Sequence, residues 1–290
     1  MSYGPEAATA DWVIEPKSGS VFARVVEVWH YRKLLGYFAG RTLQALYKRS
    51  SFGWIWMMVR VCAPIGLNSL IFGGVLNVKP TDGTPYPLFL LCGQTTWILF
   101  DRSLLFITRS MERNRKLISK VYFPRLILPV AAVSPSILFL AILSVVLLGA
   151  DVYLRQHEGI WYIPLEPRLL LAPVAVVISL TFAIAVGFWT SVLQVRYRDI
   201  RFGIRYSMPL LMYLTSVLWP LSHIKYGWAR AMVALNPMES AIELFRYGTI
   251  GTPLEISSTV IAWHLIAIAL TAASGIWFFN RVESASVDKI

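Results

Sequence analysis

The chain has 290 residues, of which 56% are hydrophobic and only 15% are charged. Soluble domains are about 45–50% apolar and about 25% charged, so this composition excludes an ordinary soluble domain and indicates a protein surrounded by lipid. The net charge of +11 fits the same class, because basic residues gather in the cytoplasmic loops of membrane proteins, and we expect no nucleic-acid partner.

The chain begins with a polar tail, residues 1–19, that lacks the apolar core of a signal peptide. In residues 20–50, apolar side chains recur at spacings of three and four, with basic residues between them. This pattern predicts a basic amphipathic helix that lies in the membrane interface. Gly36 and Gly40 weaken its middle, so two shorter helices are the alternative.

Six runs without Asp, Glu, Lys or Arg approach the roughly 20 residues that a membrane-spanning helix needs. They are Val61–Val78, Gly83–Phe100, Leu126–Ala150, Leu169–Val195, Tyr206–Ile224 and Ile256–Asn280. With a first span that begins near Trp54, they predict an all-α integral membrane fold, with six spans over residues 54–280 and a cytoplasmic tail at 281–290. Asp101 and Arg102 extend the second run, and because this pair is costly in lipid we expect it to face protein or water.

The distribution of basic residues orients these spans. With the N-terminus in the cytoplasm, 21 of the 27 Lys and Arg residues fall on the cytoplasmic side and six on the outer side. The opposite orientation would reverse this ratio, against the preference of Lys and Arg for cytoplasmic loops. We therefore predict that both termini are cytoplasmic.

One predicted cytoplasmic segment, residues 109–125, is strongly basic. It carries six basic residues and one acid, Glu112, and we expect Pro124 to interrupt any helix here. A solvated loop explains this charge. A short docking helix for a cytoplasmic partner is the sharper alternative.

The outer segment, residues 225–255, has apolar patches that are broken by Asn236-Pro237 and by glycines. Asn-Pro favours a turn, and short apolar helices dip into a membrane where they pack on protein. We therefore predict short re-entrant or interfacial helices before the last span. A surface loop with one helix is the alternative.

Three charged residues of the outer segment share one helical face, because Glu239, Glu243 and Arg246 follow one another by four and three positions. A membrane enzyme acting on lipid-linked sugars would also need convergent carboxylates or a histidine, and His157 and His223 lie on the same predicted side. No metal-ligand spacing connects these residues. We predict no catalytic residues and no metal site.

Four short motifs lie in a characteristic order between the predicted spans. They are YKRSSFG at 47–53 with Trp56 and Pro64, NRKLISK at 114–120 with Phe123-Pro124-Arg125 and Pro129, RYRDI at 196–200, and Asn236-Pro237-Met238 with Arg246 and Gly248. Over residues 40–280 the chain thereby resembles the permeases of polysaccharide-export ABC transporters. The motifs are similar, in turn, to the start of the family's first span, its two cytoplasmic loops and its outer segment.

The resemblance implies a multi-pass subunit of the cell inner membrane that exports O-antigen, capsule or teichoic acid chains. Two copies would pair around a pore for a lipid-linked polysaccharide, in contact with membrane lipid, and two copies of an ABC ATPase subunit would dock in the cytoplasm. The segments that receive the ATPase stroke would contain Glu112, Arg113, Arg115, Lys116, Lys120, Arg196, Arg198, Asp199 and Arg201. The outer re-entrant segment would contain Asn236, Pro237, Glu239, Glu243 and Arg246.

The chain itself has no G-x-x-x-x-G-K-[ST] phosphate loop, the element that cradles ATP phosphates. We therefore expect no enzyme activity and no cofactor on this chain. ATP and magnesium would bind to the partner ATPase.

A pore for a hydrophilic glycan is expected to use aromatic rings, which pack on the CH faces of sugars. The candidate rings in or near the spans are Trp97, Phe100, Trp189, Tyr206, Tyr213 and Trp219. Aromatic belts at the membrane interface explain such rings without a substrate. A drug or lipid ABC exporter therefore stays open, as does a membrane glycosyltransferase or ligase.

Overall fold

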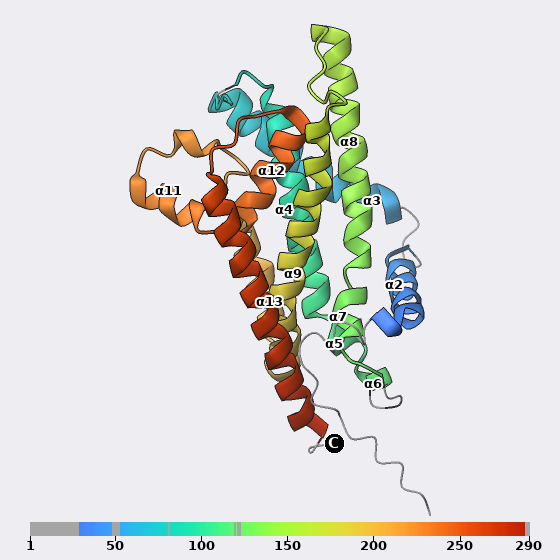
Figure 1. The fold of residues 1–290 in the computed structure, drawn as a ribbon. Helices are drawn as coiled ribbons and strands as arrows, with labels where there is room; N and C mark the ends of the chain where they lie inside the picture. Colours follow the sequence, from blue (N-terminus) through green and yellow to red (C-terminus); the bar gives the residue numbers. More distant parts are fainter. Residues whose placement is uncertain (1–28, 48–52, 81, 119, 121–122, 288–290) are drawn as a thin grey trace, which may run out of the picture.

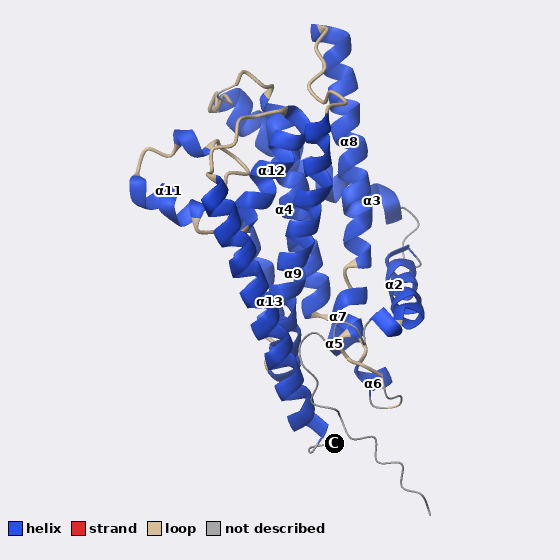
Figure 2. Cartoon of the chain, in the orientation of Figure 1, coloured by secondary structure: helices blue, strands red, loops and turns tan. Residues whose placement is uncertain are grey.

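The computed structural model describes residues 29–47, 53–80, 82–118, 120 and 123–287. Regular structure in these residues is entirely helical (Figure 2), so the all-α prediction is confirmed for them. The predicted tail at 1–19, residues 20–28 of the predicted interface helix and residues 48–52 of the first motif lie outside the described residues.

Helix α2 (Arg32–Tyr47) forms the described part of the predicted interface helix (Figure 1). It runs without a break through Gly36 and Gly40, so the alternative of an interruption at these glycines does not occur. Phe38 is only 3% exposed and packs on Phe123, with the ring centroids 5.5 Å apart. The helix therefore docks on the bundle through one apolar face.

Four helical stretches are long and apolar enough to cross a membrane: Ile55–Val75, Ile127–Glu158, Pro167–Arg196 and Ser258–Val282. They correspond to the first, third, fourth and sixth predicted spans, and they indicate a multi-pass membrane protein. Their elements are α3 (Gly53–Asn68) with the π-helix η1 (Ser69–Val75), α7 (Ile127–Ala131) with α8 (Ser134–Glu158), the 3-10 helix η2 (Pro167–Leu170) with α9 (Leu171–Arg196), and α13 (Ser258–Val287).

Helix α4 (Tyr86–Thr108) corresponds to the second predicted span but is more polar than the four stretches above. Its 23 residues extend about 35 Å, which is enough to cross a bilayer core. Neighbouring helices bury most of α4, so few of its side chains would contact lipid and the helix need not be apolar throughout. Asp101 and Arg102 form an ion pair with N–O distance 3.5 Å, and the Arg102 guanidinium lies 5.8 Å from the ring centre of Phe139 on α8. This pair faces protein, one of the two surroundings expected for it.

The predicted fifth span is not a continuous helix. Helix α10 covers Ile200–Met212, and the chain from Tyr213 to Pro220 is irregular before the 3-10 helix η3 (Leu221–His223). The prediction of one continuous helix over Tyr206–Ile224 is therefore wrong. Irregular backbone at membrane depth is tolerated where protein groups bond to it, and side chains of other helices do so here, as described below.

Helix α9 is the centre of the bundle and contacts α4, α12 (Met238–Ile250) and α13 (Figure 1). The close approach of α9 to α4 requires a glycine, because a Cβ on Gly187 would overlap the side chain of Ile107. The bundle is therefore organised around one central helix that three others cover.

The two ends of the bundle carry different short helices. Helices α5 (Ser110–Arg113) and α6 (Arg115–Ile118) lie toward the end that holds the C-terminus (Figure 1). Helices α11 (Gly227–Ala234) and α12 lie toward the other end. The N-terminal helix α2 is on the same side of the molecule as α5 to α7.

Candidate functional site

Two polar clusters lie at opposite ends of the bundle. The first, which we call the basic corner, joins α5, the end of α9 and the start of α10. It consists of Glu112, Gln194, Arg198 and Arg201. The second, which we call the outer cluster, lies between α12 and the irregular segment after α10. It consists of Ser216, Glu239, Glu243 and Arg246.

In the basic corner, the two predicted cytoplasmic segments bond to each other. Glu112 of α5 pairs with Arg201 of α10, with Oε1 and Nη1 3.4 Å apart. Gln194 is buried; its Nε2 donates to Glu112 Oε2 at 3.2 Å, and its Oε1 accepts the backbone N–H of Arg201 at 2.8 Å. The same Nε2 lies 3.3 Å from the carbonyl oxygen of Arg198. These bonds hold the two segments as one unit.

The remaining residues of the predicted coupling segments form a basic surface around this corner. The exposed members are Arg113, Arg115, Lys116, Lys120, Arg196 and Asp199. The 109–125 segment contains two one-turn helices and not a featureless loop, and the chain is non-helical at Phe123 and Pro124 as predicted. Asp199 precedes α10 but makes no side-chain capping bond.

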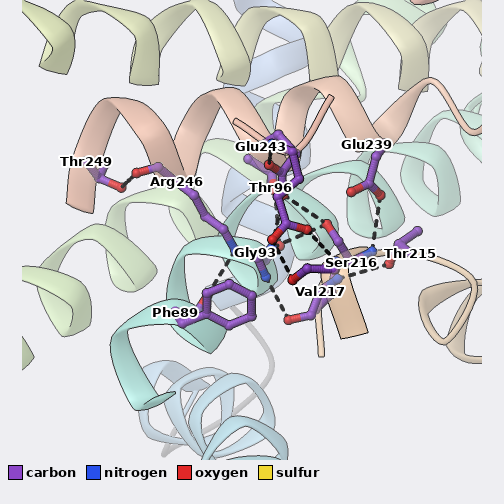
Figure 3. Close-up of polar contacts among 12 residues, drawn as sticks. Phe89, Gly93, Thr96, Thr215, Ser216, Val217, Glu239, Glu243, Arg246 and Thr249 are labelled. Carbon is purple, nitrogen blue, oxygen red and sulfur yellow. Dashed lines mark hydrogen bonds and ion pairs between the residues drawn. The ribbon is translucent and has the colours of Figure 1, made fainter. Parts of the chain in front are cut away.

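In the outer cluster, Arg246 is the principal hydrogen-bond donor (Figure 3). Its side chain is only 1% exposed. Nη2 donates to the carbonyl oxygen of Val217 at 2.9 Å, Nε donates to that of Phe89 at 3.3 Å, and Nη1 donates to Ser216 Oγ at 3.3 Å. The guanidinium carbon lies 3.6 Å from the ring centre of Phe89. Arg246 therefore ties α12 both to α4 and to the irregular segment.

Two buried carboxyl groups accompany this single arginine. Glu243 Oε1 lies 3.5 Å from Arg246 Nη1, and Glu243 Oε2 accepts the backbone N–H of Glu255 at 3.1 Å. Glu239 Oε2 accepts the backbone N–H of Ser216 at 3.1 Å, whereas its buried Oε1 has no hydrogen-bond partner in the described part of the chain. Burial, together with the neighbouring Glu243 carboxylate, raises the pKa of Glu239. The prediction that these three charged residues share one face of a helix is confirmed.

The outer cluster depends on a close fit between α4 and the irregular segment. A Cβ on Gly93 would lie 2.6 Å from Arg246 Nη2 and 3.2 Å from the Cα of Val217. Nearby, the Tyr86 hydroxyl donates to the carbonyl oxygen of Leu218 at 2.8 Å. Side chains of α4 and α12 thus bond to backbone groups that a helix would have bonded internally, and this explains why the segment need not be helical.

Helices α11 and α12 are two short helices joined by a turn, as the sequence predicts. At this turn, Asn236 Oδ1 accepts the backbone N–H of Met238 at 3.1 Å. His264 of α13 holds this turn in place, with Nδ1 2.6 Å from Ser240 Oγ and Nε2 2.8 Å from the carbonyl oxygen of Ala234. The alternative of a loop with one helix does not occur.

The predicted pore aromatics differ in exposure. Trp97 and Phe100 are only 4% and 5% exposed, so they lie in the core of the chain and do not reach a surface that a pore requires. Tyr206 and Tyr213 are 68% and 44% exposed, on α10 and just after it. The partly buried rings are Trp189 and Trp219.

Three polar residues that complete the two clusters and the turn between α11 and α12 were not predicted from the sequence: Gln194, Ser216 and His264. Each is a polar residue inside a run predicted to span the membrane, and such residues usually face protein. That signal is visible in the sequence. Their partners are not, because they lie on helices far away in the chain.

The apolar helices and the basic corner define a polytopic α-helical membrane protein with a charged surface at one end. Residues 34–250 match the model of the ABC-2 type transporter family. This match covers more than half of the chain, so the protein belongs to that family.

Named relatives cover nearly the whole chain. It is similar to the "O-antigen export system permease protein RfbA" of Myxococcus xanthus, at 29% identity over 90% of this chain and 97% of the relative. Two Klebsiella pneumoniae proteins of the same name are 26% and 27% identical, each over 86% of this chain and 92% of the relative.

Proposed function

We propose that this protein is the membrane-spanning permease subunit of an ATP-driven ABC exporter, and that its cargo is a lipid-linked polysaccharide of the O-antigen or capsule type. The basic corner carries this proposal. Its bonds join two basic segments into one unit at one end of the spans, as a stroke delivered by a separate ATPase requires. The family and the names of the relatives support the same function.

The energy source is a separate ABC ATPase, in two copies, that binds ATP and magnesium. It docks on α5, α6 and the start of α10, where Arg115, Lys116 and Asp199 are exposed. ATP binding closes the ATPase pair, and the basic corner moves with it as a rigid body. The permease then shifts between two arrangements of its helices, by as much as the closed ATPase binds one arrangement more tightly than the other.

Two copies of the chain pair around the pore. The short helix α10 and the irregular segment after it form the pore side, and Tyr206 and Tyr213 supply exposed rings on this side for stacking on sugars. The α11–α12 hairpin is re-entrant and closes the outer end. The proposed pore lining is thus narrower than the six rings predicted from the sequence.

The topology has six spans, with both termini in the cytoplasm of an inner-membrane protein. Helix α4 and the α10 region are the second and fifth spans. Single cysteines at Asp82 and Arg230, in a background without Cys62 and Cys92, are expected to react with an impermeant maleimide in intact cells. A cysteine at Arg205 is expected to react only after permeabilisation, and the reverse pattern would invert the topology.

Function is tested by deleting the gene and by reconstitution. Deletion is expected to remove the polysaccharide from the cell surface and to leave lipid-linked glycan inside, and the wild-type gene is expected to restore export. In proteoliposomes with the ATPase, charge reversal at Arg115 and Lys116 is expected to lower the ATP turnover that the permease stimulates. Unchanged turnover would remove the coupling role of this segment.

The same experiments separate the rival functions. A drug or lipid exporter would leave the surface polysaccharide intact after deletion. A glycosyltransferase or ligase would transfer sugar in membranes that contain this chain alone, without ATP. Either result would replace the proposed function.

A further inference from the structure

A small cavity lies between α2, α5, α7 and the end of α4. Its volume is about 110 Å³, equal to three or four water molecules at about 30 Å³ each, which suits a phosphate group. Its polar lining residues are Arg41, Thr42, Ser110, Arg113 and Asn114.

Positive charge surrounds this cavity. Arg41 of α2 and Arg113 of α5 both line it, and Arg41 Nη1 lies 3.5 Å from Asn114 Oδ1. Partial burial of the Arg113 side chain lowers its pKa, and the nearby charges of Arg109 and Arg41 lower it further. Among the described residues, none of these three arginines forms an ion pair, since the neighbouring acid, Glu112, is paired with Arg201.

A buried hydroxyl group points to a missing acceptor. Ser110 lines the cavity and is only 3% exposed, yet its Oγ has no hydrogen-bond partner among the residues that the structure describes. A buried donor without a partner is unfavourable, and buried hydroxyls in proteins are almost always bonded. An anion in the cavity would accept this hydrogen bond and would also balance the arginine charges.

The other wall of the cavity is apolar and includes Phe38, Phe106 and Leu128. A free inorganic anion gains nothing from such a wall, whereas the glycerol carbons next to a lipid phosphate pack well on it. The cavity also lies under α2, the helix predicted to rest in the membrane interface. Anionic phospholipids of the cytoplasmic leaflet attract basic side chains at this depth.

We propose that this cavity binds the phosphodiester group of an anionic phospholipid from the cytoplasmic leaflet. Arg41 and Arg113 donate charged hydrogen bonds to the phosphate, and Ser110 Oγ donates a neutral one. The bound lipid joins α2 to α5, so it holds the interface helix in register with the segment that carries Glu112.

The test uses the full chain in phosphatidylcholine nanodiscs with increasing phosphatidylglycerol, and native mass spectrometry counts the retained phosphatidylglycerol. The double variant Arg41→Gln, Arg113→Gln is expected to bind phosphatidylglycerol about tenfold more weakly, because charge-assisted bonds are lost. Ser110→Ala, which keeps every charge, is expected to weaken binding several-fold. Two matched controls, Arg32→Gln on α2 and Arg205→Gln on α10, remove exposed charges that do not line the cavity.

Binding by the double variant equal to that of the controls would overturn the proposal. Inorganic phosphate serves as a separate arm. If phosphate alone displaces bound phosphatidylglycerol at equal concentration, the site recognises an ion and the lipid assignment fails. A diphosphate lipid that displaces bound phosphatidylglycerol at a far lower concentration than other phospholipids do would likewise replace the proposed occupant. The assay needs neither ATPase nor glycan, so its failure is distinct from failure of the proposed function.

Discussion

The guanidinium of Arg246 donates from Nη2 to the carbonyl oxygen of Val217 at 2.9 Å, which joins α12 to the irregular segment after α10. A buried arginine is costly unless its donors have partners, and Nε, Nη1 and Nη2 all have partners here. The interaction therefore accounts for two facts together. It gives the buried guanidinium hydrogen-bond partners. It also gives the backbone carbonyl groups of the irregular segment donors, which helical N–H groups would otherwise supply.

Replacement of this arginine is expected to unfold the outer part of the protein. Arg246→Gln should lower the free energy of unfolding by about 3–5 kcal/mol, because buried acceptors and a buried carboxylate lose their partner. Arg246→Lys keeps the charge but not the planar fork, so its loss should be intermediate. Arg230→Gln on exposed α11 is the control, expected within about 0.5 kcal/mol of wild type. Melting temperatures in detergent measure all three, and equal values for Arg246→Gln and the control would refute this role.

Neutralising each of the two carboxyl groups of the outer cluster is expected to change the stability of the protein by a different amount. Glu243→Gln removes the negative charge that pairs with the buried Arg246 guanidinium and should destabilise the protein by about 3 kcal/mol. Glu239→Gln keeps an oxygen that accepts the Ser216 N–H and should change stability by about 1 kcal/mol or less. Thermal unfolding of the two variants measures this difference, and an equal loss in both would show that Glu239 is ionised and paired.

The raised pKa of Glu239 predicts that the stability of the protein depends on pH. Because the folded state raises the pKa of Glu239, folding favours the protonated form. This contribution is fully present below the unfolded pKa and is lost as the pH rises through the raised pKa of the folded state. As the pH rises through this interval, the wild-type protein should therefore lose stability relative to Glu239→Gln. A difference that stays constant with pH would contradict the assignment.

The basic corner is expected to matter for coupling more than for stability. The Glu112–Arg201 pair has side chains 37% and 31% exposed, so it contributes about 1 kcal/mol or less. Glu112→Arg and Arg201→Glu should each leave the melting temperature nearly unchanged and lower the ATP turnover of the complex with its ATPase. The double swap restores an opposite-charge pair and should recover part of that turnover. A double variant as poor as the singles would show that the pair itself does not couple the segments.

Glycine substitutions test the close fit of α4. Gly93→Ala places a Cβ 2.6 Å from Arg246 Nη2 and should cost about 1–3 kcal/mol. Gly149→Ala on α8 meets no atom within 4 Å and should be neutral or stabilise the helix by up to about 1 kcal/mol. Unfolding of both variants in detergent gives the comparison, and equal stability would mean that α4 and the irregular segment do not pack as described.

The sequence by itself determined where apolar helices lie and which end of the protein is basic. Lipid and solvent impose length, hydrophobicity and charge on each segment separately, so these properties are local. The stretches around α3, α8, α9 and α13, the turn at Asn236 and the shared face of Glu239, Glu243 and Arg246 follow from such local rules.

The tertiary structure alone decided where the fifth apolar run stops being helical and which polar residues meet. A backbone group accepts a bond from a distant side chain only if the fold places that side chain beside it. Val217 and Arg246 are 29 positions apart, and Glu112 and Gln194 are 82 positions apart. The burial of Trp97 and the cavity between Arg41 and Arg113 have the same origin, because packing between helices is a property of the assembled chain and of no single segment.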